Sequence, residues 1–304
     1  MSLENQKEYE DKIIIRDYPY SICVEITAYC NLRCKICPNH SLKREKGYMD
    51  MGLFRKIAEE TADKFPKSKF WMNGLGEPLL HKDFISMVKY ATDVGIKNTF
   101  INTNAMLLDK KMLDSLIESG IHGIVVSIDG FSKEAYESIR IGGNRELVYR
   151  NVMNALECIH SVVGDSPVLE VQFIEMPSII NEKEQWYEFW KDKGANIKFQ
   201  TYATWGGKVD CMEENMLNRY ACGDSNNLFV LWDGRIPYCL SGDPECEDQL
   251  GNANTENLYD IWLRKSHTFS YYHKSHQFDK LPLSCQRCPD WHTIPARHIA
   301  ANVL

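Results

Sequence analysis

Two hydrophobic periodicities alternate along the chain between residues 20 and 203. Short runs rich in β-branched and aromatic residues predict strands, and apolar residues spaced three and four apart predict helices between them. The predicted strands cover residues 20–27, 69–72, 98–102, 123–127, 168–173 and 196–202. The predicted helices lie around residues 54–61, 84–91, 113–117, 147–159 and 186–190. Such alternation is typical of an α/β fold with a parallel sheet covered by helices.

The last third of the chain has a different pattern. Asp233-Gly234 separates two short apolar runs and predicts a β-hairpin turn. A chain of 304 residues is long enough for one large domain and a smaller partner. We therefore expect a polar N-terminal segment, a large α/β unit and a small C-terminal unit, with the bounds 1–19, 20–210 and 211–304.

Composition and charge argue against some classes of function. Hydrophobic residues make up 44% of the chain and charged residues 25%, as in ordinary soluble globular proteins. The net charge of -7 argues against a nucleic-acid partner, which usually requires a basic surface. No apolar run approaches the roughly 18 residues of a membrane span, and the first residues lack an apolar signal core. We expect a cytoplasmic protein with no membrane partner.

Three of the eleven cysteines lie close together at Cys30, Cys34 and Cys37, directly after the first predicted strand. Thiolates suit zinc or iron–sulfur clusters. A structural zinc takes four ligands, and His40 is the nearest candidate for a fourth. A [4Fe–4S] cluster held by three cysteines instead leaves one iron free to bind another molecule. Barrel-like α/β folds carry their catalytic residues at the C-terminal ends of the strands, which is where these three cysteines lie.

A second group of five cysteines lies in the last third: Cys222, Cys239, Cys246, Cys285 and Cys288. The first two flank the predicted hairpin, and the last two form a pair separated by two residues, as is common at metal centres. Four thiolates can bind zinc or a fully ligated [4Fe–4S] cluster, and their spacing does not choose between these. A turn before Cys246 should carry it away from the others. The remaining cysteines are expected to be small buried residues: Cys23, Cys158 and Cys211.

The pattern Cys30-x3-Cys34-x2-Cys37 resembles the signature loop of the radical S-adenosylmethionine (SAM) superfamily. The resemblance implies a partial (β/α)6 TIM-like barrel whose [4Fe–4S] cluster binds SAM through its open iron. It also implies that reduction of the cluster cleaves SAM to a 5′-deoxyadenosyl radical, which removes hydrogen from a substrate carbon. An electron donor such as flavodoxin or ferredoxin would supply the electron.

Further segments resemble the SAM-contacting motifs of that family. Residues 73–78 look like its Gly-Gly-Glu-Pro motif, and residues 102–104 look like its ribose-proximal segment. Ser127 and Arg140 resemble a pair that holds the SAM carboxylate, with a surface salt bridge as the alternative for Arg140. The SAM contacts implied by the resemblance are Ile36, Gly74, Leu75, Gly76, Glu77, Pro78, Asn104, Ser127 and Arg140.

The predicted hairpin, the Gly251-Asn252 pair and the segment 258–262 resemble the SPASM/twitch extension of radical SAM enzymes. Because only a short tail follows Cys288, the match is to the shorter twitch form, a small β-hairpin/helix iron–sulfur extension. That form implies one auxiliary [4Fe–4S] cluster. Its expected ligands are Cys222, Cys239, Cys285 and Cys288.

The leading interpretation is an enzyme that dehydrogenates, epimerises or eliminates on a small polar metabolite such as a sugar or cyclitol. The layout is similar to that of 2-deoxy-scyllo-inosamine dehydrogenase, although residues 205–207 and 240–241 depart from it. The alternatives are a peptide-modifying maturase and a non-catalytic module that binds two zinc ions. The sequence does not identify a general base. The candidate catalytic residues, which lie near strand ends where they could face the cavity, are Glu25, Glu175, Tyr202 and Trp205.

Overall fold

The structure is a computed structural model, and it describes residues 17–161, 166–209, 222–275 and 277–290. Most of the predicted N-terminal segment lies outside these ranges, and so does Cys211.

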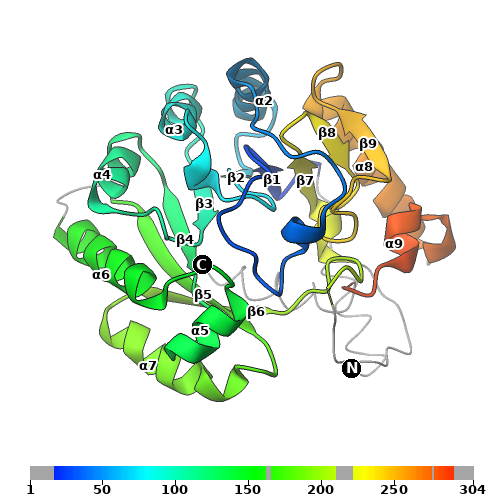
Figure 1. Cartoon of the computed structure of the whole chain (residues 1–304). Coiled ribbons are helices and arrows are strands. Elements are labelled where there is room, and N and C mark those ends of the chain that lie inside the picture. Colours follow the sequence, from blue (N-terminus) through cyan, green and yellow to red (C-terminus); the bar gives the residue numbers. More distant parts are fainter. Residues whose placement is uncertain (1–16, 162–165, 210–221, 276, 291–304) are drawn as a thin grey trace.

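One parallel sheet of seven strands organises the fold, in the order β6-β5-β4-β3-β2-β1-β7. Figure 1 shows the strands fanning round an arc that does not close into a barrel. The strands are β1 (Ser21–Val24), β2 (Lys69–Trp71), β3 (Thr99–Thr103), β4 (Gly123–Ser127), β5 (Val168–Glu175), β6 (Asn196–Thr201) and β7 (Asn227–Val230). The predicted partial barrel is thus confirmed, and its six core strands gain a seventh from the C-terminal part of the chain.

Helices cover the outer side of the arc (Figure 1). They are α2 (Met51–Lys64), α3 (Phe84–Asp93), α4 (Lys110–Glu118), α5 (Lys133–Ile139), α6 (Arg145–Ser161) and α7 (Lys183–Asp192). Each longer helix buries one apolar stripe, as Phe54, Ile57 and Ala58 do in α2. All five residues of β4 are buried, as expected for a strand of a parallel sheet that is covered on both faces. Only α5 was missed, because it is short and rich in charge.

The turn at Asp233-Gly234 is present, but the predicted hairpin around it is wrong. The Gly234 amide donates to the Leu231 carbonyl at 2.9 Å, which reverses the chain. β7, before the turn, pairs in parallel with β1, whereas β8 (Arg235–Pro237) pairs in antiparallel fashion with β9 (Gln249–Asn252). The physical reason is that the apolar residues of β7 are buried at the edge of β1, which would otherwise stay unpaired.

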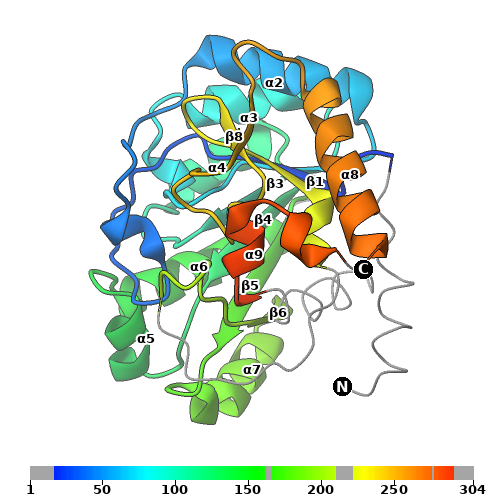
Figure 2. The ribbon, with the colours of Figure 1, turned by 90° about the vertical axis from the view of Figure 1, so that its right-hand side faces the viewer.

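The C-terminal unit packs beside β7 and α2. Its helices are α8 (Leu258–Lys274) and the short α9 (Leu283–Arg287), which Figure 2 shows in front of the sheet edge. Trp262 of α8 is fully buried. Short 3-10 segments complete the described chain: η1 (Pro38–Ser41), η2 (Pro78–Leu80), η3 (Ile180–Glu182), η4 (Gly223–Asn226) and η5 (Phe278–Lys280).

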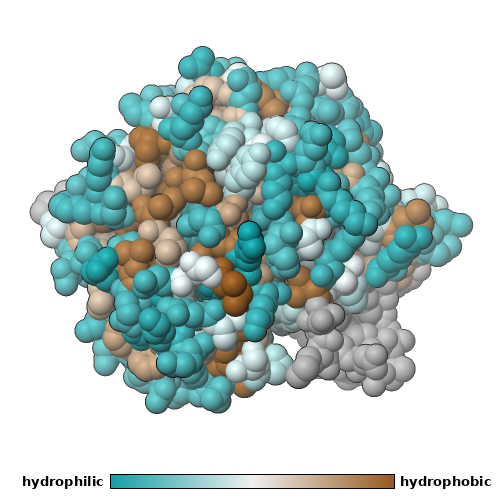
Figure 3. Space-filling model, viewed as in Figure 1, coloured by the Kyte–Doolittle hydropathy of each residue, from teal (hydrophilic) through white to brown (hydrophobic). Residues whose placement is uncertain are grey.

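The face seen in Figure 1 is largely hydrophilic, with separate apolar patches, the most extended of which lies at its upper left (Figure 3). Among the residues that the structure describes, no helix is both long enough and apolar enough to cross a bilayer.

Candidate cofactor site and auxiliary cysteine site

The loop after β1, residues 25–50, carries the first three cysteines across the inside of the arc (Figure 1). Cys34 is buried, and Cys30 and Cys37 are partly buried. The Cys37 amide donates to the Cys34 carbonyl at 3.2 Å, so the loop coils on itself. Burial, together with the nearby charge of Cys34, raises the pKa of the Cys30 thiol to about 11 and that of Cys37 to about 12. The three thiols therefore lie within one another's electrostatic reach.

This arrangement fits a cluster held by three thiolates. The Arg140 guanidinium donates from Nη1 to Cys34 Sγ over 3.8 Å. The ligands of a [4Fe–4S] cluster bind different irons, so three cysteines on one coiled loop suit such a cluster.

The segment that follows β2 lies directly against the cysteine loop. The Glu77 amide donates to the Tyr29 carbonyl at 2.9 Å. A Cβ atom on Gly76 would lie 2.0 Å from the Thr27 carbonyl oxygen. Only glycine allows the two backbones to come this close, which explains the glycine of this motif physically. Pro78 follows and begins η2.

The Glu77 side chain is buried and ties the end of β2 to the end of β3. Its carboxylate accepts hydrogen bonds from Thr103 Oγ1 at 2.7 Å and from the Asn104 amide at 2.9 Å. Burial raises the pKa of Glu77, although these hydrogen bonds oppose that rise. The Glu77 carboxylate is therefore occupied by hydrogen bonds within the scaffold.

Two further polar side chains stand at the ends of the neighbouring strands. Asn104 donates from Nδ2 to Asn31 Oδ1 at 2.8 Å, which connects β3 to the cysteine loop. Ser127, the last residue of β4, donates from Oγ to Asn102 Oδ1 at 2.8 Å. The structure thus places both predicted SAM contacts at the carboxyl edge of the sheet that carries the cysteines.

Arg140 is the residue that caps the C-terminal end of α5. Its Nε donates to Asp129 Oδ2 at 2.7 Å, and Nη2 makes a second hydrogen bond to the same oxygen. Asp129 is fully buried and also accepts from the Ile174 amide at 2.8 Å. Burial alone would lower the pKa of Arg140, but Asp129 and Cys34 outweigh it and raise the pKa. The pair is a buried ion pair beside the cysteine loop, not a surface salt bridge.

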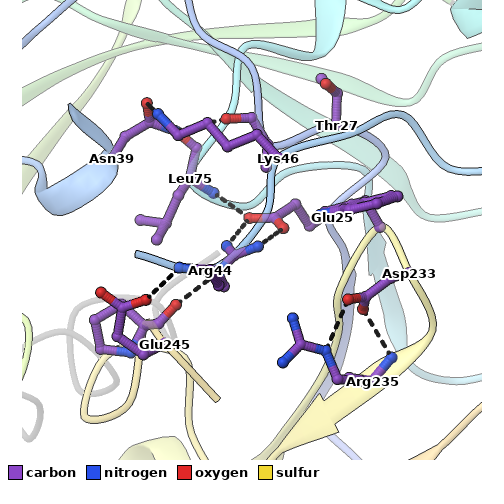
Figure 4. Close-up of polar contacts among 12 residues, drawn as sticks. Glu25, Thr27, Asn39, Arg44, Lys46, Leu75, Asp233, Arg235 and Glu245 are labelled. Carbon is purple, nitrogen blue, oxygen red and sulfur yellow. Dashed lines mark hydrogen bonds and ion pairs between the residues drawn. The ribbon is translucent and has the colours of Figure 1, made fainter. Parts of the chain in front are cut away.

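Glu25, a candidate general base, is held in a buried ion pair. Arg44 donates from Nη1 and Nη2 to its two oxygens at 2.8 and 2.7 Å, and the Leu75 amide adds a third bond at 3.1 Å. Figure 4 shows this cluster and its continuation into the C-terminal unit. Arg44 also donates from Nε to the Pro244 carbonyl at 2.7 Å, and its amide donates to Glu245 at 2.9 Å. These bonds join the cysteine loop to the C-terminal unit.

The other three candidate catalytic residues lie in different surroundings. Glu175 ends β5 and pairs with Lys183 Nζ at 2.5 Å. Tyr202 follows β6 and is partly buried. Trp205 donates its indole N–H to the Ile36 carbonyl at 2.9 Å. The contact between Trp205 and Ile36 was not predicted, because 169 positions separate the two residues.

The predicted auxiliary cysteines gather around one place. Burial is the main cause that raises the thiol pKa of Cys222, Cys239 and Cys288, and other cysteines of the set add to each rise. Gly242 touches two of them: its amide donates to Cys239 Sγ at 3.4 Å, and a Cβ atom on it would lie 3.5 Å from Cys288 Sγ. Cys285 also belongs to this group, because its electrostatic effect helps to raise the pKa of Cys288. This geometry supports the predicted ligand set, which stays a prediction.

Cys246 has other neighbours. Its pKa is raised to about 12 by burial and then by Asp243. It packs with Leu75, Leu231 and Leu240 in a small apolar cluster. Cys246 therefore lies between the two units, and its place outside the ligand set stays a prediction.

Two buried charges beside these cysteines were missed from the sequence. Lys265 on α8 is fully buried, burial lowers its pKa, and its Nζ donates to the Asn227 carbonyl at 2.5 Å. Asp224 accepts from Asn227 Nδ2 at 3.0 Å and lies 3.7 Å from Cys239 Sγ. Helical spacing could have indicated the burial of Lys265, because this residue lies on the same face of α8 as the buried Trp262.

Comparison with known families gives two matches. The family model described as the radical SAM superfamily matches residues 24–179. The SPASM model, described as an iron–sulfur cluster-binding domain, matches residues 222–289.

Curated relatives cover part of the chain. A probable GTP 3',8-cyclase of Methanococcus maripaludis is 31% identical over 179 residues, which are 59% of this chain and 57% of the relative. The tungsten-containing aldehyde ferredoxin oxidoreductase cofactor-modifying protein of Pyrococcus furiosus is 40% identical over 107 residues, 35% of this chain and 30% of the relative. The chain thus matches less than three fifths of the length of either relative.

Solved structures share the fold over most of the chain. BtrN in complex with AdoMet and 2-DOIA has a TM-score of 0.62 at 23% identity, over 89% of this chain and 92% of BtrN. SuiB of Streptococcus suis bound to the precursor peptide SuiA has a TM-score of 0.66 at 15% identity, over 85% of this chain and 67% of SuiB. At these identities the likeness concerns the fold.

Proposed function

The chain belongs to the radical SAM superfamily, and we propose that it removes a hydrogen atom from a carbon of a small polar substrate such as a sugar or cyclitol. Its cofactors are a [4Fe–4S] cluster, SAM and an auxiliary iron–sulfur cluster in the SPASM domain. The observation that carries the proposal is the coiled three-cysteine loop at the carboxyl end of β1, where Cys34 faces the buried Arg140.

The residues of the site have different roles in binding the cluster and SAM. Cys30, Cys34 and Cys37 would hold the first cluster, which when bound would supply the reducing electron for SAM cleavage. The backbone of residues 74–76 forms a wall against the cysteine loop. Arg140 keeps N–H donors beyond those that Asp129 and Cys34 use, so it can both brace the loop and orient the SAM carboxylate.

The auxiliary site is assigned to Cys222, Cys239, Cys285 and Cys288, as one [4Fe–4S] cluster. It would anchor substrate, accept an electron or brace the fold. An external donor such as flavodoxin or ferredoxin would reduce the first cluster. Both clusters need reduced thiols, which is consistent with a cytoplasmic setting.

The substrate class rests on the layout of the chain. BtrN, whose structure holds 2-DOIA, shares the fold over 92% of its length. A peptide is the second candidate, because SuiB bound to its precursor peptide shares the fold over 85% of this chain. For neither substrate does the described chain identify a general base: the Glu25 carboxylate is taken by Arg44, and Glu175 is paired with Lys183.

The test is anaerobic SAM cleavage. Reconstituted, reduced protein should release 5′-deoxyadenosine, and the Cys30→Ala/Cys34→Ala/Cys37→Ala variant should release none. Deuterated cyclitols, sugars and peptides are then compared for deuterium transfer into 5′-deoxyadenosine, which identifies the substrate class. Release of 5′-deoxyadenosine by the triple variant would show that the cluster assignment is wrong.

A further inference from the structure

A tight turn after β6 reaches the cysteine loop. Trp205 has φ 56°, and Gly206 and Gly207 follow with φ 66° and 84°. A positive φ is uncommon for a residue with a bulky side chain and persists only where the surroundings enforce it. In this conformation the Trp205 indole N–H donates at 2.9 Å to the carbonyl of Ile36, the residue before Cys37.

The same turn is bonded to the loop of the auxiliary cysteines through Asp290. This residue is fully buried, and its amide donates to Cys288 Sγ at 3.3 Å. Its carboxylate accepts from the Thr204 amide at 2.7 Å and from the Gly206 amide at 2.9 Å. Asp290 therefore connects an auxiliary ligand to the residues on both sides of Trp205.

A second contact connects the turn to Cys239. A Cβ atom on Gly206 would lie 2.4 Å from the Gly242 carbonyl oxygen, so the two backbones are in direct contact. The Gly242 amide in turn donates to Cys239 Sγ at 3.4 Å. The position of the Trp205 turn thus depends on two of the four auxiliary cysteines.

We propose that Trp205 is a positioning residue that couples the auxiliary site to SAM binding. A cluster held by Cys239 and Cys288 fixes Gly242 and Asp290, and these fix the turn. The turn then holds the carbonyl of Ile36, which is one of the SAM contacts that the superfamily resemblance implies. A carbonyl oxygen has two lone pairs, so Ile36 can accept from Trp205 and from a ligand together.

Coupling of this kind is reciprocal. Filling the auxiliary site should tighten SAM binding, and SAM should protect the auxiliary cluster from loss. A turn that only braced the fold would change stability and leave the affinity for SAM unaltered. The inference rests on the ligand set given under the proposed function, so its test measures iron content and SAM affinity separately.

The first arm compares two indole hydrogen bonds. Trp205→Phe keeps the ring and removes the donor, and should weaken SAM binding about two- to tenfold, the worth of one neutral hydrogen bond, at unchanged iron content. Trp232 is the matched control, since its indole N–H donates at 3.1 Å to the Glu45 carbonyl of the same loop. Trp232→Phe should leave the SAM dissociation constant unchanged. Equal affinities of the Trp205→Phe variant and the wild type would overturn the proposal.

The second arm removes an auxiliary ligand. Cys288→Ser should lose about half of the iron, weaken SAM binding by a similar factor, and alter the EPR spectrum of the reduced first cluster with SAM. The Trp205→Phe/Cys288→Ser variant should bind SAM no more weakly than Cys288→Ser alone, because both changes break one connection. Cys246→Ser is the control and should match the wild type.

Two results of the second arm would overturn the inference at different points. Loss of half the iron with unchanged SAM affinity, or weakening factors that multiply in the double variant, would disprove the coupling. Full iron in Cys288→Ser would instead disprove the ligand set, and with it the route through Asp290.

Discussion

Buried carboxylates at the strand ends hold the scaffold of the site together. Glu25, Glu77 and Asp129 are each almost fully buried, and each accepts hydrogen bonds from residues distant in the chain. A buried charge is tolerated only when it is paired or hydrogen-bonded, so each carboxylate fixes the position of its donors. Their stability effects should therefore be large and separable from catalysis.

Removing the Glu77 carboxylate should destabilise the fold. Glu77→Ala leaves the Thr103 hydroxyl and the Asn104 amide without their acceptor, and we expect a loss of about 2–4 kcal/mol in the free energy of unfolding. Glu77→Gln keeps one acceptor oxygen and should lose about half as much. Urea unfolding of the cluster-free protein measures both. An alanine variant as stable as the wild type would contradict this role.

Arg140 should contribute to folding as well as to cofactor binding. Arg140→Ala leaves the fully buried Asp129 without its cation, which typically costs about 3–5 kcal/mol. Arg140→Ala/Asp129→Ala should be less destabilised than the sum of the single variants, because no unpaired charge remains. A double-mutant cycle by urea unfolding gives the coupling. Additive effects would place the stabilising contacts of Arg140 elsewhere.

At the scale of elements, hydrophobic periodicity predicted the six core strands and five of the helices around them. It failed where other forces decide. α5 has only seven residues, and its position is set by polar contacts. β7 was recognised as a strand, but its partner was not, because the turn at Asp233-Gly234 suggested a local hairpin and the buried edge of β1 prevailed.

One polar contact that sets α5 should make stability depend on pH. Glu182 in η3 accepts from the Phe131 amide at 2.7 Å and from the Ser132 amide and hydroxyl at 3.0 and 2.6 Å. Burial would raise the pKa of Glu182, but these hydrogen bonds outweigh it and lower the pKa. The stabilisation is therefore present above the unfolded-state pKa and is lost as the pH falls through the lower folded-state pKa.

Glu182→Gln should consequently be less stable than the wild type at pH 7, by at most about 1 kcal/mol since the side chain is partly exposed. The difference should shrink on acidification and vanish once the pH lies below the lowered folded-state pKa of Glu182. Thermal unfolding measured from pH 7 downwards checks this. Glu184→Gln, a change at an exposed position in α7, is the control. A difference that persists unchanged in acid would rule out the charge as its source.

At the scale of the whole molecule, two cysteine sites share one chain and are joined by a few bonds. The first was readable in the sequence because its three ligands fall within one loop, as Cys30, Cys34 and Cys37. The second could be predicted only from the spacing of its cysteines. The buried charges of Lys265 and Asp224 were not predicted, because tertiary packing brings them next to this site. The contact of Trp205 with Ile36 likewise arises from the fold.

Because the two sites use different cysteines, each should bind its iron–sulfur cluster independently of the other. The Cys30→Ala/Cys34→Ala/Cys37→Ala variant should keep about four of about eight irons per chain after anaerobic reconstitution, because all auxiliary ligands remain. Iron and sulfide analysis with absorption spectroscopy measures this. Stoichiometric zinc in place of iron would favour a zinc-binding module, and complete loss of iron would show that the auxiliary site cannot form by itself.

The pairing of β7 with β1 also affects how the chain is made. Ser21 and Asn227, neighbours in this pairing, are 206 positions apart. At about 5–20 residues per second, a ribosome needs roughly 10–40 seconds to span that distance. During this interval β1 presents an open edge, the kind that templates aggregation, next to three unmetallated thiols. Chains released before residue 227 should therefore be insoluble, and the late strand should set the earliest moment at which the first cluster can be inserted into a finished site.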